Sequence, residues 1–182
     1  MTHRRIVAAV AVAAMLAAGC GSRSQSAPTA APSSGRDAAA AQPLPARDIP
    51  RELRFTAKTL DGQEFTGASL MGKPAVLWFW TPWCPTCQGE APMVGRVAAA
   101  HPGVTFVGVA GQDQVPAMKE FVDKFKVEGF AELADTGGMV WAKFGVTRQP
   151  AFAFVHPDGS VDVVKGPLSE PDLTERVTAL SR

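Results

Sequence analysis

Two cysteines separated by two residues are the part of this sequence best suited to chemistry. Cys84 and Cys87 lie in the segment Trp-Cys-Pro-Thr-Cys, directly after the apolar run 75–80. A buried strand that runs straight into a helix places both thiols in the first helical turn, where they can form and break a disulfide with each other. The sequence therefore predicts a redox-active dithiol that serves as its own redox centre, with no separate cofactor.

The two thiols are expected to differ in role. Thiol–disulfide exchange is carried out by the thiolate, and free N–H groups and the dipole at a helix N-terminus favour negative charge. Cys84 is at that terminus, where the N–H groups of Thr86 and Cys87 can point at its sulfur. We therefore expect Cys84 to be the nucleophile and Cys87, one turn further in, to be the resolving thiol. The intervening Pro85 and Thr86 do not reveal the direction of electron flow.

Two structural explanations compete with a redox role for the cysteine pair. A zinc site needs four ligands, usually including a second closely spaced Cys/His pair, whereas this domain offers only His101 and His156, far apart in the sequence. A purely structural disulfide would close a very small loop and would constrain the unfolded chain little. We therefore predict no metal at this pair.

The surrounding sequence predicts the elements that must position the dithiol. Alternating residues around an Asp-Gly turn indicate a hairpin within 53–65, and continuous or alternating apolar runs indicate further strands. Amphipathic spacing and helix-opening prolines indicate helices. The expected strands are 75–80, 104–109, 130–134, 151–155 and 161–164, and the expected helices are 85–100, 115–125, 138–144 and 171–180.

A β-α-β unit followed by a hairpin and a helix predicts an α/β domain with a mixed sheet. With Cys-x-x-Cys at the first strand-to-helix junction, the pattern resembles the thioredoxin fold over about residues 51–182. The resemblance implies a central mixed β-sheet flanked by helices, here with an N-terminal β-hairpin extension. It also implies a cis-proline at Pro150 facing the dithiol, with Gln149 flanking the substrate. The alternative is an ordinary trans proline that opens a strand.

The residues around the cysteines resemble a particular branch of thioredoxin-like proteins. Thioredoxins carry a buried aspartate six residues before the first cysteine, where this chain has Trp78. The spacing Trp-Cys-x-x-Cys-x-x-Glu-x-Pro instead resembles extracytoplasmic lipoproteins and cytochrome-maturation proteins. There the glutamate, here Glu90, is a candidate proton acceptor for the buried thiol; the alternative is an exposed helix carboxylate. Trp83 is expected to show an edge beside the sulfur and to contact apolar client segments.

The N-terminus has the pattern of a lipoprotein export signal. A cationic start precedes an apolar stretch of about thirteen residues, too short to span a bilayer, and small residues precede Cys20. We predict a signal peptide at 1–19, a lipidated Cys20 at the head of a disordered Ala/Pro/Ser tether over 20–48, and a thioredoxin-like domain over 49–182. The alternative is an ordinary cleaved signal with an incidental cysteine.

Charge and composition narrow the range of partners. With 18 basic and 17 acidic residues the net charge is +1, so the composition gives no reason to expect a nucleic-acid partner. The whole pattern resembles actinobacterial lipoproteins of the Dsb type. That resemblance implies an oxidoreductase, lipid-anchored to the cell membrane, that forms disulfides in reduced or unfolded exported proteins and is recycled by a membrane redox partner.

Three other functions remain open from the sequence. The same chemistry run in reverse would make a membrane-tethered reductant for cytochrome c maturation. Thr81, three residues before Cys84, matches the Thr-x-x-Cys of thiol peroxidases, although Leu77 stands where those proteins carry a proline. A non-enzymatic binding lipoprotein on the same scaffold would not depend on Cys84 at all.

Overall fold

The structure is a computed structural model that describes residues 49–181. The predictions for residues 1–48, including lipidation of Cys20 and the tether, lie outside the described residues. Within 49–181, none of the helices combines the length and apolarity that crossing a membrane requires.

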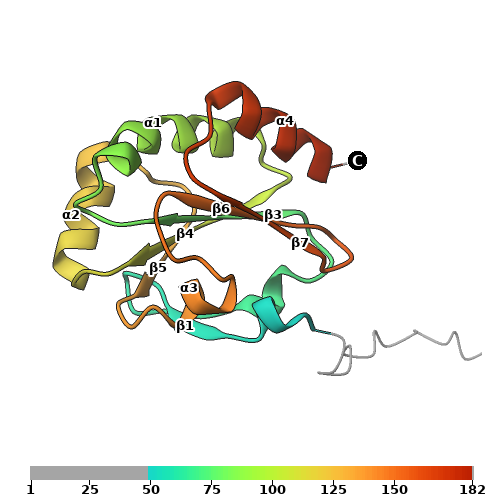
Figure 1. The fold of residues 1–182 in the computed structure, drawn as a ribbon, viewed down its shortest axis with the longest axis horizontal. Coiled ribbons are helices and arrows are strands. Elements are labelled where there is room, and N and C mark those ends of the chain that lie inside the picture. The colour runs from blue at the N-terminus through green and yellow to red at the C-terminus, as the bar shows by residue number, and fades with distance from the viewer. Residues whose placement is uncertain (1–48, 182) are drawn as a thin grey trace, which may run out of the picture. The chain divides into compact units, whose positions relative to one another are not determined.

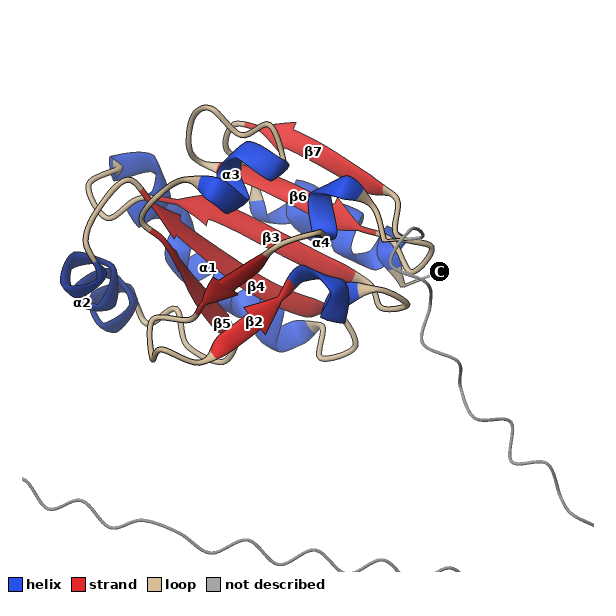
Figure 2. Ribbon diagram, turned by 90° about the horizontal axis from the view of Figure 1, so that it is seen from below, coloured by secondary structure: helices blue, strands red, loops and turns tan. Residues whose placement is uncertain are grey.

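A five-stranded mixed sheet organises the domain (Figure 1, Figure 2). Its strand order is β5-β4-β3-β6-β7. β3, β4 and β5 run parallel, while β6 is antiparallel to β3 and β7 is antiparallel to β6. The strands are β3 (Ala75–Trp80), β4 (Thr105–Gly111), β5 (Ala131–Asp135), β6 (Ala151–Val155) and β7 (Val161–Lys165).

β3 is the central strand because its sequence is apolar on both faces. All six of its residues are buried. Trp78 and Trp80 point to one face of the sheet, and Leu77 and Phe79 point to the other, so each face has its own core cluster. Such a strand is stable only when helices or loops cover both sides of the sheet.

Helices and a hairpin supply that cover. Figure 1 shows α1 and α4 on one side of the sheet and α3 with the hairpin on the other. The elements are α1 (Pro85–Ala100), α2 (Val115–Phe125), α3 (Met139–Lys143), α4 (Glu170–Leu180), and the hairpin of β1 (Thr56–Lys58) and β2 (Glu64–Thr66). Short 3-10 turns, η1 (Arg51–Leu53) and η2 (Gly67–Leu70), flank the hairpin, which meets the edge of β5 through a bridge between Thr59 and Leu133.

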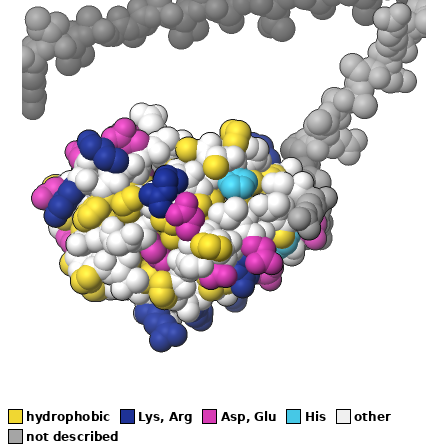
Figure 3. Space-filling view, turned by 90° about the horizontal axis from the view of Figure 1, so that it is seen from above, with side chains coloured by type: hydrophobic (Ala, Val, Ile, Leu, Met, Phe, Trp, Pro, Cys, Tyr) yellow, Lys and Arg dark blue, Asp and Glu magenta, His cyan; other side chains and the backbone are white. Residues whose placement is uncertain are grey.

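The face that carries α1 and α4 mixes charges of both signs with apolar side chains. Figure 3 views the molecule from this side and shows basic and acidic groups interspersed. The ion pair between Arg96 of α1 and Glu170 of α4, with Nη2 and Oε2 2.7 Å apart, joins the two helices at the surface. This face therefore presents no concentrated positive field of the kind that a polyanion requires.

The predicted architecture is confirmed, and several predicted bounds match those observed. β3, α1, α2 and β6 begin and end where the sequence predicts. The predicted end of β4 at residue 109 is wrong. The strand continues through Ala110 and Gly111, which pair with Ala134 and Asp135 of β5. α4 begins one residue earlier than predicted, at Glu170, where the Ser169 hydroxyl accepts a hydrogen bond from the Asp172 N–H and caps the helix.

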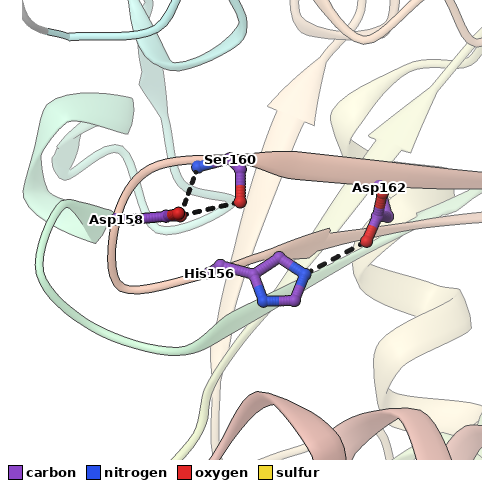
Figure 4. A network of polar contacts seen from close by, with 4 residues as sticks. All are labelled: His156, Asp158, Ser160 and Asp162. Atoms are coloured by element: carbon purple, nitrogen blue, oxygen red, sulfur yellow. Dashed lines mark hydrogen bonds and ion pairs between the residues drawn. The ribbon is translucent and has the colours of Figure 1, made fainter.

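The β6–β7 turn carries a serine, a histidine and two aspartates close together (Figure 4). The Ser160 hydroxyl donates to Asp158 at 2.7 Å, and His156 Nε2 lies 3.1 Å from Asp162 Oδ2. A catalytic triad would need the serine hydroxyl to bond to the histidine, and here it bonds to an aspartate instead. These contacts therefore close a turn, at the opposite end of β6 from Pro150.

Position 108 of β4 needs a glycine because a neighbouring side chain occupies the space that a Cβ would take. It pairs in register with Glu132 of β5, and a Cβ at Gly108 would collide with the Glu132 carboxyl group. We therefore expect Gly108→Ala to lower the free energy of unfolding by about 1–3 kcal/mol, as overpacking of a core does.

Gly95→Ala on α1 is the matched control for this prediction. A Cβ there would make an ordinary contact of 3.7 Å with the Lys126 carbonyl oxygen. Replacing a helical glycine with alanine should therefore raise the free energy of unfolding by about 0.5–1 kcal/mol. Urea denaturation measures both variants, and a G108A variant as stable as the wild type would contradict the collision.

Candidate active site

Cys84 occupies the N-cap of α1, where a backbone N–H faces its sulfur. β3 ends at Trp80, and the chain turns so that the Cys84 N–H donates to the Thr81 carbonyl oxygen at 3.2 Å. Pro85 opens the helix, where its missing N–H costs nothing. The Cys87 N–H donates to Cys84 Sγ at 3.2 Å, so one of the two donors predicted for this sulfur makes the bond. The helix N-terminus thus directs positive charge at the sulfur.

Cys87 has a different environment from Cys84. Cys84 is 5% exposed and Cys87 is 0% exposed, and both are free thiols. Burial raises the pKa of Cys87 well above its ordinary value, and a hydrogen bond with the Cys84 side chain raises it further, although a hydrogen bond with the Thr81 backbone acts in the opposite direction. The protein therefore holds Cys87 as a thiol next to the more accessible sulfur.

The second loop near the dithiol contains a cis peptide bond between Gln149 and Pro150. Pro150 is buried and Gln149 is half-buried. The next residue, Ala151, pairs with Phe79 near the end of β3, so this loop lies at the same edge of the sheet as the cysteine loop. The geometry is that implied by the thioredoxin resemblance, with the proline close to the end of the strand that leads to Cys84.

Glu90 is buried, so the alternative of an exposed helix carboxylate is wrong. Its side chain is 7% exposed. Its Oε2 accepts a hydrogen bond from Trp78 Nε1 at 3.2 Å, and its Oε1 accepts one from the Leu168 N–H at 2.9 Å. Burial raises the pKa of Glu90 above the ordinary range, and these two hydrogen bonds oppose that shift. Since Glu90 lies one turn after Cys87 on α1, its charge also acts on the Cys87 thiol.

The three tryptophans that lead into the dithiol separate into core and surface. Trp78 and Trp80 are fully buried, with ring centroids 5.8 Å apart, whereas Trp83 is 53% exposed. The Trp83 Nε1 donates to the Gln112 carbonyl oxygen at 3.4 Å, which attaches the ring to the loop after β4. The protein thus presents an aromatic surface immediately before Cys84.

Glu132 is a buried carboxyl group that sequence reasoning missed. It lies on β5 and accepts a hydrogen bond at Oε2 from Trp80 Nε1, at 3.0 Å. Its Oε1 has no hydrogen-bond partner among the described residues, and burial raises the pKa of Glu132 to about 8. The available signal was a glutamate within the otherwise apolar segment 130–134.

Thr81 is the other buried polar side chain left unsatisfied at this site. It is 0% exposed, and its hydroxyl has no hydrogen-bond partner among the described residues.

Across residues 49–181, no three His, Cys, Asp or Glu side chains group together as metal ligands would.

Comparison with known proteins identifies the family. The model of the AhpC/TSA family matches residues 48–164. The protein belongs to this family. The soluble secreted antigen MPT53 of Mycobacterium tuberculosis (strain H37Rv) is 52% identical over 132 residues, which cover 71% of this chain and 76% of that protein. This AhpC/TSA-family protein is therefore closely related to a mycobacterial protein over most of its length.

Two solved structures of disulfide oxidoreductases resemble this protein in sequence and in fold. The structure of MTB dsbF, in mixed oxidized and reduced forms, shares 70% identity with a TM-score of 0.72, covering 72% of this chain and 98% of that one. A secreted Mycobacterium tuberculosis disulfide oxidoreductase homologous to DsbE shares 52% identity with a TM-score of 0.67, covering 70% and 97%. This AhpC/TSA-family protein is a thiol–disulfide oxidoreductase with a thioredoxin-like fold.

The raised pKa of Glu132 predicts a pH dependence of stability. In the unfolded chain the carboxyl group ionises near 4.5, whereas in the folded protein it ionises at about 8. Between these values only the unfolded state releases the proton, so the stability of the wild type falls as pH rises through this window. Because Glu132→Gln cannot ionise, its free energy of unfolding relative to wild type should rise by about 1–4 kcal/mol from pH 4.5 to pH 8.

Urea denaturation at several pH values measures this difference. The exposed Glu128→Gln is the matched control, since it removes the same charge at the surface and should follow the wild type. An E132Q variant whose stability also runs parallel to the wild type would show that Glu132 ionises normally in the folded protein.

Proposed function

We propose that this oxidoreductase acts outside the cytoplasm as an oxidase that forms disulfides in exported proteins, with Cys84 as nucleophile and Cys87 as resolving thiol. One observation carries the assignment of roles: Cys84 Sγ accepts the Cys87 N–H at the N-cap of α1, while Cys87 is fully buried. A sulfur at a helix N-terminus is a good leaving group because it departs as a stabilised thiolate.

The exchange proceeds in two steps. A client thiolate attacks Sγ of Cys84 in the Cys84–Cys87 disulfide, forming a mixed disulfide and releasing Cys87, which takes up a proton because burial disfavours its thiolate. A second client thiolate then attacks the client sulfur of the mixed disulfide, and Cys84 leaves as a thiolate. Two electrons pass from the client to the enzyme, and a membrane redox partner must remove them to restore the disulfide.

Residues around the dithiol have proposed supporting roles. Gln149, which precedes the cis-Pro150, offers backbone groups that can pair with an extended client segment. Trp83 provides an exposed aromatic surface for apolar client residues. Glu90 is the proposed proton acceptor for Cys87, since it is buried one turn away on the same helix. Pro85 and Thr86 set the spacing between the two thiols.

The proposed location rests on the N-terminal motif. We propose that residues 1–19 are a signal peptide, that Cys20 is lipidated, that 20–48 form a tether and that 49–182 form the catalytic domain. The relatives MPT53 and the DsbE homologue are described as secreted, which supports export. Attachment to the membrane surface rests on the small residues before Cys20 alone.

The reduction potential tests the direction of electron flow. We expect equilibrium with glutathione to give a value between about −120 and −180 mV, the range of known oxidants and isomerases. The enzyme should then oxidise a reduced, unfolded client, and Cys84→Ala should abolish this activity because no mixed disulfide can form. The matched variant Cys87→Ala cannot form the Cys84–Cys87 disulfide and should also fail to oxidise the client. When given a client that already contains a disulfide, its Cys84 thiolate should attack that disulfide, release one client thiolate and remain trapped as a mixed disulfide, because Cys87 is absent to resolve it.

A different reduction potential or a different activity would assign another function to the protein. A potential near −270 mV, the value for thioredoxin, would contradict the oxidase and favour a reductant for cytochrome c maturation. Peroxide consumption much faster than that of a simple dithiol would favour a thiol peroxidase. A cellular phenotype that survives Cys84→Ala would favour a binding protein.

Trp83 predicts a preference for polypeptide clients. We expect Trp83→Ala to raise the KM for an unfolded client by about threefold to tenfold, as loss of an aromatic contact does, without changing exchange with glutathione. Met139→Ala is the matched control, since Met139 is the other exposed large hydrophobic residue in the described chain, at 70%. Equal effects of W83A on glutathione and on the client would contradict a client-binding role.

A further inference from the structure

Two buried carboxyl groups hold a stacked pair of indoles in the core cluster that contains both cysteines. Trp78 Nε1 donates to Glu90 at 3.2 Å, and Trp80 Nε1 donates to Glu132 at 3.0 Å. The rings of Trp78 and Trp80 are 5.8 Å apart and inclined by 28°. Each indole is thus held at its nitrogen by one carboxyl group and lies against the other indole, and Phe121 of α2 stacks on Trp80 with ring centroids 4.1 Å apart.

Glu132 is an unusual residue for this core position. Its side chain is 7% exposed, one of its oxygens has no hydrogen-bond partner among the described residues, and burial raises the pKa of its carboxyl group to about 8. Burial of such a group lowers stability, and an apolar side chain would fill the same space at less cost. Gly108 in the neighbouring strand leaves the room that the carboxyl group occupies. Two core positions are therefore adapted to a group that weakens the fold, which calls for a functional reason.

We propose that Glu132 is a positioning residue for thiol–disulfide exchange, because by holding Trp80 against Trp78 it fixes the Glu90 carboxyl group beside Cys87. The chain of contacts is continuous from Glu132 to Trp80, from Trp80 to Trp78 and from Trp78 to Glu90. Glu90 then acts on the resolving thiol from one helical turn away. The proposal rests on the proposed roles of Cys84 and Cys87, and it holds for either direction of electron flow.

The titratable and charged groups near Glu132 come from α1, the hairpin turn, α2 and the loop before β5. The facing residues of β3 and β4, Trp80 and Gly108, carry no charge, and the titratable groups on the α1 side are Glu90, Cys84 and Cys87. The charged residues of the hairpin turn, of α2 and of the loop before β5 line a surface cleft that Glu132 also borders; they are Asp61, Lys119, Asp123 and Glu128. Trp80 is the one hydrogen-bond partner of the Glu132 carboxyl group in the described chain.

Two substitutions separate the hydrogen bond from the charge. Glu132→Gln keeps an oxygen that accepts from Trp80 Nε1 and cannot ionise, whereas Glu132→Leu removes the acceptor and leaves the indole N–H unpaired. Both variants preserve the approximate volume of the side chain, and the surface substitution Glu128→Gln is the matched control. The test measures two separate rates with oxidised glutathione on the folded enzyme from pH 6 to pH 9.5: formation of the mixed disulfide at Cys84 and its resolution by Cys87.

We expect substitution of Glu132 to change the rate at which Cys87 resolves the mixed disulfide and to leave the rate of its formation at Cys84 unchanged. Below pH 8, E132L should resolve the mixed disulfide more slowly than the wild type by about threefold to tenfold, which is what one lost hydrogen bond is worth. E132Q should match the wild type below pH 8. Above pH 8 the wild type should slow, because a new negative charge in the core disfavours the Cys87 thiolate, and E132Q should lack this inflexion. E128Q should match the wild type throughout.

Other results would overturn the proposal. An E132L enzyme with wild-type rates, differing only in its melting temperature, would mean that Glu132 merely packs. An E132Q enzyme as slow as E132L at pH 7 would show that the Trp80 hydrogen bond is not what matters. A Cys84→Ala enzyme that still forms the mixed disulfide would overturn the proposed function instead, so the two failures are distinguishable.

Discussion

The hydrogen bond from the Cys87 N–H to Cys84 Sγ is the interaction on which the proposed chemistry of this protein depends. It exists because a fully buried strand, β3, ends at a short turn and feeds directly into a helix whose first N–H groups lack partners within the helix. The sulfur at the N-cap takes up one of these donors. Cys84 thereby faces a backbone donor, while Cys87, one turn further along the same helix, is enclosed in the core.

The core beneath this junction is more polar than its composition suggests. Two tryptophans on one face of β3 supply indole N–H groups, and each of them meets a buried carboxyl group, Glu90 on α1 or Glu132 on β5. Both carboxyl groups have raised pKa values because of their burial. A low-dielectric core strengthens the influence of one such group on another. The buried titratable groups of this core therefore come from α1 and β5, and the indoles that bond to them come from β3.

Local patterns predicted most of the elements but few of the contacts between them. The apolar run 75–80 and the amphipathic helices 85–100 and 115–125 were found with their observed bounds, since periodicity and prolines mark them strongly. The buried Glu90 carboxyl group accepts a hydrogen bond from the Leu168 N–H, 78 residues away in the sequence. Glu132 was missed for a similar reason: it meets Trp80 across 52 residues and occupies space that only the register of β4 with β5 places at Gly108. Tertiary pairing, and not propensity, decides such contacts.

The pH dependence of alkylation of the two thiols in the folded, reduced enzyme tests the central claim most directly. Mass spectrometry after brief exposure to iodoacetamide reports each cysteine separately. The account predicts that Cys84 is modified near neutral pH, faster than an ordinary peptide thiol, and that Cys87 stays unmodified until the protein is unfolded. Equal modification of both thiols, or faster modification of Cys87, would contradict it.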